Sequence, residues 1–266
     1  MENIVRFPDK NSEEKAALQL PRIIGHRGAA AYAPENTLVG LHTAADMGVK
    51  WVEIDVKLSR DGEPVVFHDE TLERITGTSG SVAETDWKDL KQLDAGAWFS
   101  EGFVDERIPH LEEALSVILD RGLGLNLEIK PCPGREKETA EVALDWLSRI
   151  WPEEDAPKPL ISSFQAVSLE VSLLMMPEYP RGYLMAADLP ETLENWQDRA
   201  AYLQAATVHF DRRFFAAEDG VMMSSLAASH YPLLCYTVND AVEAEAMFDA
   251  GIVSVFSDRP DILDDL

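Results

Sequence analysis

Two periodicities of apolar positions alternate along the chain from residue 22 onward. Short apolar runs are typical of buried strands, whereas the stretches between them carry apolar residues at every third or fourth position, as amphipathic helices do. The pattern therefore predicts eight strands alternating with seven helices. The expected strands are Arg22–His26, Trp51–Lys57, Gly124–Lys130, Leu160–Phe164, Arg181–Leu184, Thr207–Phe210, Leu233–Val238 and Ile252–Ser257. The expected helices are Leu38–Met47, Leu111–Leu119, Ala140–Ile150, Leu169–Met176, Leu193–Leu203, Val221–Ser229 and Ala241–Phe248.

Strands that alternate with helices in this way predict an α/β protein with a parallel sheet, because each helix carries the chain back to the start of the next strand. Eight such units in roughly 250 residues match a TIM (β/α)8 barrel. We expect residues 1–266 to form a single domain with this fold.

A long gap separates the second expected strand from the helix that begins at Leu111. Residues 58–68 predict a hairpin with Asp61-Gly62 as its turn. Residues 69–109 then predict a small insertion after strand two, and insertions at that end of a strand lie over the mouth of a barrel. The aromatic residues of the insertion either face the mouth or form the core of the insertion, and they are Trp98, Phe99 and Phe103.

The chain is strongly acidic, with 23 Lys and Arg against 48 Asp and Glu, a net charge of −25. Phosphate backbones and anionic membrane surfaces repel such a protein, so nucleic-acid binding and membrane anchoring are not expected. The two cysteines, Cys132 and Cys235, form no disulfide framework, and no apolar run matches a signal peptide or a membrane span. We therefore expect a cytoplasmic protein with free thiols, and the sequence carries no signal for an oligomeric state.

Candidate chemistry begins on the second strand, where Glu53 and Asp55 alternate with aliphatic residues at positions 52, 54 and 56. In a parallel barrel the aliphatic face packs against the helices, so both carboxylates point inward. Carboxylates buried without compensation are costly. A bound metal ion would compensate them, and structural salt bridges are the alternative interpretation.

The third strand repeats this alternation, and Asn126, Glu128 and Lys130 point inward from it. Glu128 completes a group of three carboxylates with Glu53 and Asp55. An all-oxygen set of ligands favours Mg²⁺ or Ca²⁺, whereas zinc would favour Cys and His spacings that the chain lacks.

Two histidines end extended runs that lead to the same mouth. His26 is followed by Arg27 and by Gly28, which permits close approach of the backbone to a ligand, and His68 is followed by Asp69, which can orient its ring. Imidazole suits acid–base chemistry at neutral pH, so His26 and His68 are the candidate general acid and base. Of the other histidines, His42 and His230 are expected to face solvent, and His110 and His209 have no assigned role.

The charges of the candidate site sum to a cationic value. The three carboxylates contribute −3, and a divalent ion with Arg27 and Lys130 contributes +4. Such a site would accept a phosphodiester anion in spite of the acidic surface around it.

These residues resemble the glycerophosphodiester phosphodiesterases, most closely their bacterial cytosolic members, from about Arg22 to the end of the chain. The resemblance implies a TIM barrel and a metal-dependent hydrolysis of glycerophosphodiesters to sn-glycerol 3-phosphate and an alcohol. The motifs that carry it are His26-Arg27-Gly28, Ala33-Pro34-Glu35-Asn36-Thr37, Glu53-Ile54-Asp55-Val56, Asp61-Gly62, Pro64-Val65-Val66, His68-Asp69, Leu72-Glu73-Arg74, Leu93-Asp94-Ala95-Gly96, Trp98-Phe99, Leu127-Glu128-Ile129-Lys130, Ser162-Ser163-Phe164, Tyr236-Thr237-Val238-Asn239 and Ser257-Asp258. The site residues that it implies are His26 and His68 as general acid and base, Glu53, Asp55 and Glu128 as metal ligands, and Arg27 and Lys130 as phosphate contacts.

Two positions depart from the pattern of many family members, which carry Trp in place of Tyr236 and Thr in place of Ser257. Tyr236 is therefore a candidate substrate contact that shapes the alcohol pocket. At the start of the first helix, Asn36 or Thr37 is expected to act as the cap. Two other functions are open at this point: a related phosphodiesterase that acts on lysophospholipids or releases a cyclic product, and a binding protein that keeps the metal site without turnover.

Overall fold

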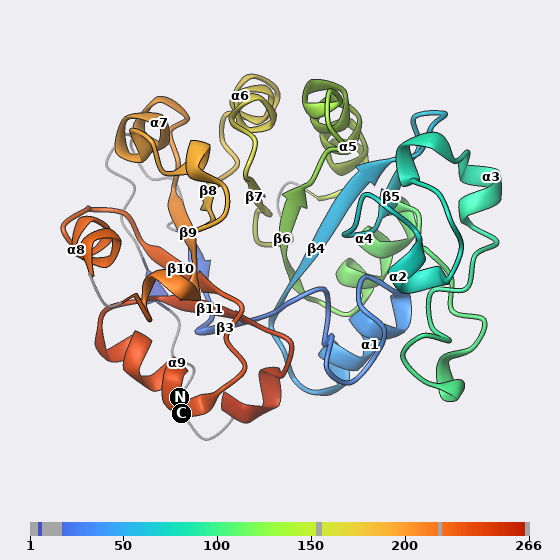
Figure 1. Ribbon diagram of the computed structural model, residues 1–266, viewed down its shortest axis with the longest axis horizontal. Coiled ribbons are helices and arrows are strands. Elements are labelled where there is room, and N and C mark those ends of the chain that lie inside the picture. Colours follow the sequence, from blue (N-terminus) through green and yellow to red (C-terminus); the bar gives the residue numbers. More distant parts are fainter. Residues whose placement is uncertain (1–4, 7–17, 153–155, 218–219, 264–266) are drawn as a thin grey trace.

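The computed structural model describes residues 5–6, 18–152, 156–217 and 220–263. Eight parallel strands form a closed barrel, because β3 pairs with β11 on one side and with β4 on the other (Figure 1). This confirms the predicted TIM barrel. The strands are β3 (Ile23–Gly25), β4 (Trp51–Leu58), β6 (Gly124–Ile129), β7 (Leu160–Ser163), β8 (Arg181–Met185), β9 (Thr207–Asp211), β10 (Leu233–Tyr236) and β11 (Ser254–Ser257). Outside the barrel, β1 (Val5–Arg6) pairs with β2 (Gln19–Leu20).

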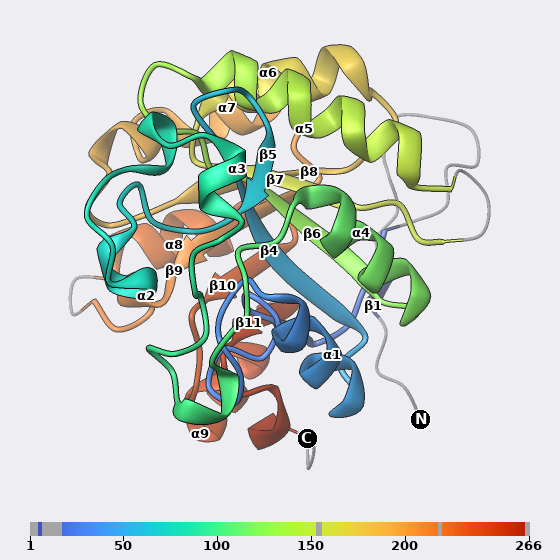
Figure 2. The same ribbon diagram turned by 90° about the vertical axis from the view of Figure 1, so that its right-hand side faces the viewer.

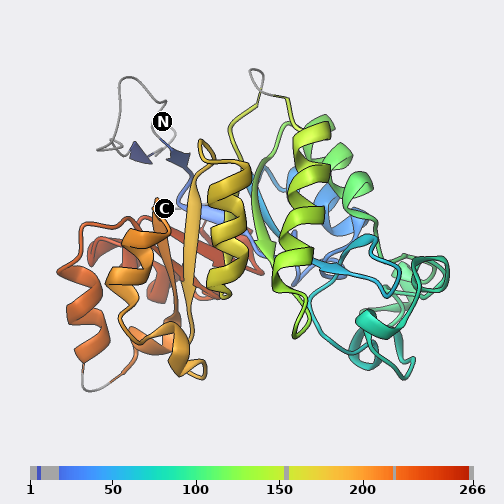
Figure 3. The same cartoon turned by 90° about the horizontal axis from the view of Figure 1, so that it is seen from above.

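Helices cover the outside of the barrel and connect its strands (Figure 3). Each of the seven predicted helices is present, with shifted ends. The helix expected from Ala140 begins at Glu136, where acidic residues of the first turn complement the helix dipole. The helix expected from Leu193 begins at Trp196, because a 3₁₀ turn over Pro190–Thr192 precedes it. The connecting helices are α1 (Leu38–Asp46), α4 (Leu111–Asp120), α5 (Glu136–Ile150), α6 (Ala166–Met175), α7 (Trp196–Tyr202), α8 (Val221–Ala227) and α9 (Ala241–Asp249).

After β11 the described chain continues into a 3₁₀ turn over Pro260–Leu263. Among the described residues, no helix combines the length and the apolar character that crossing a membrane requires.

The interior of the barrel is apolar at one end. Trp51 lies in a buried cluster with Leu20, Ile24 and Phe256, so the segment that precedes β3 helps to close this end. Gly124, opposite Trp51 on the neighbouring strand, makes room for the indole, because a Cβ atom there would lie 2.2 Å from the Trp51 ring. This close packing fixes the spacing of β4 and β6, the two strands that carry the candidate carboxylates.

The predicted hairpin is confirmed, since β5 (Pro64–Val66) pairs antiparallel with the end of β4. Gly62 in its turn has a φ of +87°, a conformation that favours glycine. The segment 69–109 follows and lies to one side of the barrel (Figure 2). It contains α2 (Glu73–Thr76), α3 (Trp87–Leu90) and two 3₁₀ turns, Val82–Glu84 and Glu101–Phe103.

Aliphatic side chains, rather than the aromatic group, form the core of this segment. The buried cluster contains Leu72, Ile75 and Leu90 and continues onto the hairpin. The interpretation of Trp98 and Phe99 as that core is therefore wrong. Trp98 is 40% exposed and stacks edge to face on Phe99 at the surface.

Candidate active site at the mouth of the barrel

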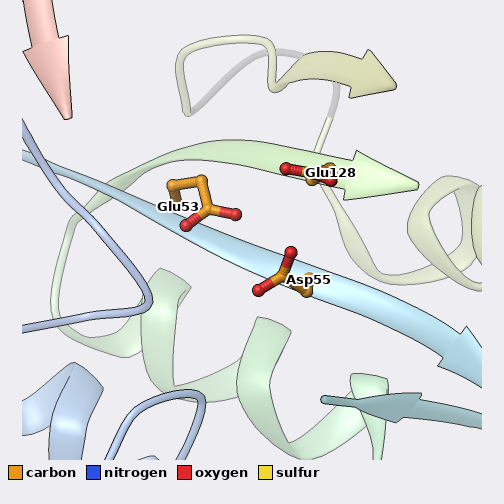
Figure 4. A group of neighbouring side chains, drawn as sticks. All are labelled: Glu53, Asp55 and Glu128. Atoms are coloured by element: carbon orange, nitrogen blue, oxygen red, sulfur yellow. The ribbon is translucent and has the colours of Figure 1, made fainter. Parts of the chain in front are cut away.

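Three buried carboxylates meet inside the barrel at its C-terminal end (Figure 4). Glu53 and Asp55 come from β4 and Glu128 from β6, and Asp55 is directly opposite Glu128 in the parallel register. One carboxylate oxygen of each lies within 4.8 Å of the others. The alternation in the sequence thus brings together the three residues that it predicted to point inward.

Two cations lie against these carboxylates. The Arg27 backbone N–H donates to Glu53 Oε2 at 2.9 Å, and Arg27 Nε lies 3.5 Å from Asp55. Lys130 Nζ donates to Glu128 at 2.8 Å and lies 3.5 Å from Asp55 Oδ1. Salt bridges therefore exist at the site, and among the described residues Arg27 and Lys130 have side-chain nitrogens within 4.0 Å of the carboxylates of Asp55 and Glu128.

The pKa values of the two β4 carboxyls move in opposite directions. Burial, together with the charges of Asp55 and Glu128, raises the pKa of Glu53 well above its usual value. Burial also acts to raise the pKa of Asp55, but the charges of Lys130, His68 and Arg27 outweigh it and hold that pKa far below the usual value. Glu53 is therefore the carboxylate that most needs further positive charge.

The side chains fit a divalent cation at this position. Glu53 Oε1 is buried and accepts no hydrogen bond from the described residues, which is uncommon for a buried carboxylate oxygen. Together with the oxygens of Asp55 and Glu128 it forms an all-oxygen set of ligands, the kind that Mg²⁺ and Ca²⁺ prefer.

Each candidate histidine is held by an aspartate through its Nδ1 atom. His26 Nδ1 lies 2.6 Å from Asp258 Oδ1, and His68 Nδ1 lies 2.6 Å from Asp69 Oδ1. Burial and the charge of Arg27 lower the pKa of His26, and Asp258 acts in the opposite direction. Nε2 of each ring is then the atom that can exchange a proton, and both rings line one pocket of about 240 Å³ with Glu53.

Asp258 was missed as a partner of His26 because 232 positions separate the two residues. It directly follows β11, and residues that follow barrel strands lie at the mouth, which is the signal that was available in the sequence. Asn239 fixes Asp258 by donating to its Oδ2 at 2.7 Å and accepting from its backbone N–H at 2.8 Å.

The loop after β3 packs against α1. Gly28 has a φ of +92°, and a Cβ atom there would lie 2.8 Å from the backbone of Gly40, so the glycine allows close contact with α1. Thr37 is the cap of α1, because its Oγ1 accepts from the Gly40 N–H at 3.1 Å. Asn36 instead orients Asp55: its Nδ2 donates to Asp55 Oδ2 at 2.8 Å, and its Oδ1 accepts from the Asp55 N–H at 3.2 Å.

Tyr236 forms part of the wall of the pocket. Its hydroxyl donates to the Met185 carbonyl at 2.6 Å, and its ring packs edge to face against Phe164 with the centroids 6.0 Å apart. The one proton of the hydroxyl is thus engaged with the backbone, so the ring is the part of Tyr236 that can shape the cavity.

A network of ion pairs connects the insertion to the site. Arg74 of α2 donates to both oxygens of Glu35 at 2.8 and 2.7 Å and to Asp69 at 2.6 Å. Glu35 in turn accepts from Arg27 at 2.7 Å. Arg74 therefore joins the carboxylate that holds His68 to the carboxylate that holds Arg27, a connection that the sequence did not indicate.

The remaining four histidines lie outside this arrangement of acid and base. His42 and His230 are exposed, as predicted. His110 is the N-cap residue of α4, and its side chain accepts from the Glu112 N–H at 3.1 Å. His209 is buried deep in the pocket, and burial lowers its pKa to about 3.

A closed (β/α)8 barrel with a group of carboxylates and cations at its mouth is the framework of a TIM-barrel enzyme. The chain belongs to the glycerophosphoryl diester phosphodiesterase family, whose model matches residues 26–262. It is 31% identical to a glycerophosphodiester phosphodiesterase of Caldanaerobacter subterraneus over 91% of this chain and 95% of that one.

Solved structures give the same result. A phosphodiesterase of Oleispira antarctica, solved in complex with the product sn-glycerol 3-phosphate, is 42% identical, with a TM-score of 0.85 over 92% of this chain and 96% of that one. A glycerophosphodiester phosphodiesterase of Agrobacterium tumefaciens is 26% identical, with a TM-score of 0.71 over 93% of this chain and 100% of that one.

Proposed function

We propose that this protein hydrolyses glycerophosphodiesters to sn-glycerol 3-phosphate and an alcohol, with a divalent cation and two histidines as general acid and base. The observation that carries the proposal is the group of three buried carboxylates that faces the same pocket as two aspartate-held imidazoles. The Oleispira relative supports the product, since its structure contains sn-glycerol 3-phosphate.

Glu53, Asp55 and Glu128 are the residues that would hold the cation, Mg²⁺ or Ca²⁺. When bound, the ion supplies positive charge against the phosphate oxygens as charge develops on them. Arg27 and Lys130 add two fixed charges beside it. The three carboxylates, Arg27, Lys130 and the ion would together carry a net charge of +1, which allows this group to bind a phosphodiester anion although the protein carries −25.

The two histidines divide the proton transfers. One takes the proton of the nucleophile while the other gives a proton to the departing alcohol oxygen, and Asp258 and Asp69 keep the rings oriented for this exchange. Arg27 and Lys130 hold the phosphate while both transfers occur.

This arrangement of residues is compatible with either of two nucleophiles, water or the neighbouring hydroxyl group of the glyceryl moiety. Attack by water gives glycerol 3-phosphate in one step, whereas attack by the neighbouring glycerol hydroxyl first gives a cyclic phosphate. Phosphorus NMR of the reaction mixture separates the two routes, because a cyclic phosphate gives its own signal before the final product accumulates.

We also propose that residues 69–109 form an insertion over the mouth, within a single barrel domain. Two of its residues support this position, since Asp69 holds His68 and Arg74 is bonded to Glu35. The acidic surface and the two free, buried thiols support a cytoplasmic enzyme of small diesters.

The test of the function is release of glycerol 3-phosphate from glycerophosphocholine, first with EDTA and then with Mg²⁺, Ca²⁺ or Mn²⁺ added back. We expect that chelation stops product formation and that one of the ions restores it. Lysophosphatidylcholine serves as a second substrate, and faster turnover of it would assign the chain to the lysophospholipid reaction. Binding of the diester without product under any of the ions would contradict an enzymatic role.

A further inference from the structure

The pocket continues below the carboxylates into a polar floor, which we define as Asn126, Ser162 and His209. All three side chains line the pocket, and none of the three residues is more than 1% exposed. Asn126 lies beside Glu53 in the register of β4 and β6 and therefore one inward position deeper than Glu128. The mechanism proposed above uses none of these residues.

The side-chain amide of Asn126 has its nitrogen hydrogen-bonded and its oxygen without a hydrogen bond from the described residues. Its Nδ2 donates to Ser162 Oγ at 2.9 Å, which fixes the orientation of the amide. Its Oδ1 is buried and accepts no hydrogen bond from the described residues. A buried acceptor without a donor costs about 1–3 kcal/mol, so an acceptor of this kind that lines a pocket is suited to a donor group of the ligand.

His209 adds a neutral polar group to the floor. Its Nε2 lies 2.8 Å from Thr207 Oγ1, and the ring fits only because Gly182 lacks a side chain: a Cβ atom there would lie 2.5 Å from Nε2. Burial lowers the pKa of His209 to about 3, so the imidazole is uncharged at neutral pH. The floor thus offers hydrogen bonds but no charge, which suits hydroxyl groups rather than an ammonium or a phosphate group.

We propose that the floor binds the hydroxyl groups of the glyceryl moiety, with Asn126 Oδ1 as the principal acceptor. This inference rests on the proposed function and adds the polyol-binding subsite to it. Leu184 and Phe256 line the same pocket and can contact the carbon chain between the hydroxyls. The glyceryl group would then point into the barrel and the alcohol would point outward.

The test compares the binding of two phosphate monoesters by calorimetry in the presence of the activating ion. Glycerol 3-phosphate and propyl phosphate have the same carbon chain, and only the first has hydroxyl groups. For the wild type we expect a Kd for glycerol 3-phosphate at least tenfold lower than that for propyl phosphate. Asn126→Leu should raise the Kd of glycerol 3-phosphate about tenfold and change that of propyl phosphate less than about threefold.

Ser162→Ala and Ser163→Ala provide a matched pair on β7. Ser162 is the partner of Asn126 in the floor, whereas Ser163 donates to the Ile129 carbonyl and does not line the pocket. We expect Ser162→Ala to reduce the preference for glycerol 3-phosphate and Ser163→Ala to leave it unchanged. The Ser162→Ala result decides the question if Asn126→Leu does not fold.

Three results would overturn the subsite. They are equal binding of the two esters by the wild type, an equal loss of both esters in Asn126→Leu, and a changed ion requirement in that variant, which would place Asn126 at the metal instead. Failure of the proposed function would look different: the wild type would release no glycerol 3-phosphate from any diester, whatever the binding experiment shows.

Discussion

The two ends of the barrel interior differ in character although the same two strands, β4 and β6, line both of them. Trp51 and Gly124 face each other at one end of β4 and β6, and Asp55 and Glu128 face each other at the other end. The first pair is packed so closely that Gly124 has no room for a Cβ atom. The second pair places two carboxylates side by side, which costs free energy unless positive charge compensates it.

An inward-pointing side chain in this barrel can therefore belong either to an apolar core or to a polar pocket, depending on its level along the strand. Glu53 and Trp51 are only two residues apart on one strand and both point inward, yet Trp51 belongs to a buried apolar cluster and Glu53 to the polar pocket. Substitutions at the apolar end should therefore affect stability, and those at the mouth should affect activity.

The largest effect is expected at the two histidines of the mouth. His26→Ala and His68→Ala should each lower kcat by about 10² to 10⁴, because each removes a proton-transfer group. The free energy of unfolding should change by less than about 1 kcal/mol, since both rings are only partly buried. Turnover of glycerophosphocholine and denaturant titration measure the two quantities.

Two further variants sharpen this result. Asp258→Asn should reduce kcat less than His26→Ala, because it disturbs the orientation of the ring without removing it. His42→Ala is the control, since His42 is exposed on α1. Near-normal turnover in both His26→Ala and His68→Ala would disprove the assignment of general acid and base.

The second prediction concerns the apolar end. Trp51→Ala should lower the free energy of unfolding by about 3–5 kcal/mol, as large-to-small changes in a close-packed core do. The folded fraction should keep a kcat within a few-fold of the wild type, because the carboxylates lie in the layers above. Trp98→Ala, on the exposed surface of the insertion, should cost about 1 kcal/mol or less. A loss of kcat in Trp51→Ala without loss of stability would break the separation of the two ends.

The sequence predicted the barrel, the hairpin and the inward carboxylates because each leaves a short-range signal. Period-two alternation around Glu53 and Asp55, and Asp61-Gly62 between two extended runs, are local patterns that a parallel barrel and a tight turn impose. His68 and Asp69 are adjacent, so their pairing was predicted as well, and it is confirmed.

The parts that the sequence did not predict depend on contacts between distant segments. The bond between His26 and Asp258 needs the closure of β11 against β3, and the network through Arg74 and Glu35 needs the insertion folded onto the mouth. Asn36 or Thr37 was expected to cap a helix; Thr37 does so, and Asn36, with a φ of +56°, bonds through its amide to Asp55 instead. No local periodicity encodes such arrangements.

The third prediction concerns pH. His209 has a pKa of about 3 in the folded protein against 6.5 in the unfolded chain, because burial disfavours its charged form. Between pH 6.5 and 3 the unfolded state binds more protons at this residue, so stability falls as the pH falls. At pH 5 the loss from this residue is about 2 kcal/mol. Relative to the wild type, His209→Gln should gain that amount between pH 7 and pH 5, and thermal unfolding at the two pH values measures it.

The smallest effect is expected at Glu53, the carboxylate whose pKa is raised by burial and by its two acidic neighbours. Without a divalent ion, Glu53→Gln should unfold with a free energy about 1 kcal/mol higher than the wild type at neutral pH, because it removes a carboxylate from two neighbouring ones. The pKa of Glu53 is raised on folding, so the gain is present above the unfolded value of 4.5 and disappears below it, where the carboxyl is protonated in both states.

With the activating ion bound, the wild type should become more stable than Glu53→Gln. The ion should raise the free energy of unfolding of the wild type by binding the folded state, and it should stabilise Glu53→Gln much less, because that variant has lost a ligand. Thermal unfolding with EDTA and with the ion measures both effects, and Glu101→Gln, at an exposed carboxylate, should follow the wild type in each condition. Equal stabilisation of the wild type and Glu53→Gln would show that the ion binds elsewhere. Lower stability of Glu53→Gln in EDTA would show that the salt bridges already compensate the three carboxylates, and the contrast between the two ends of the barrel would then be one of chemistry and not of stability.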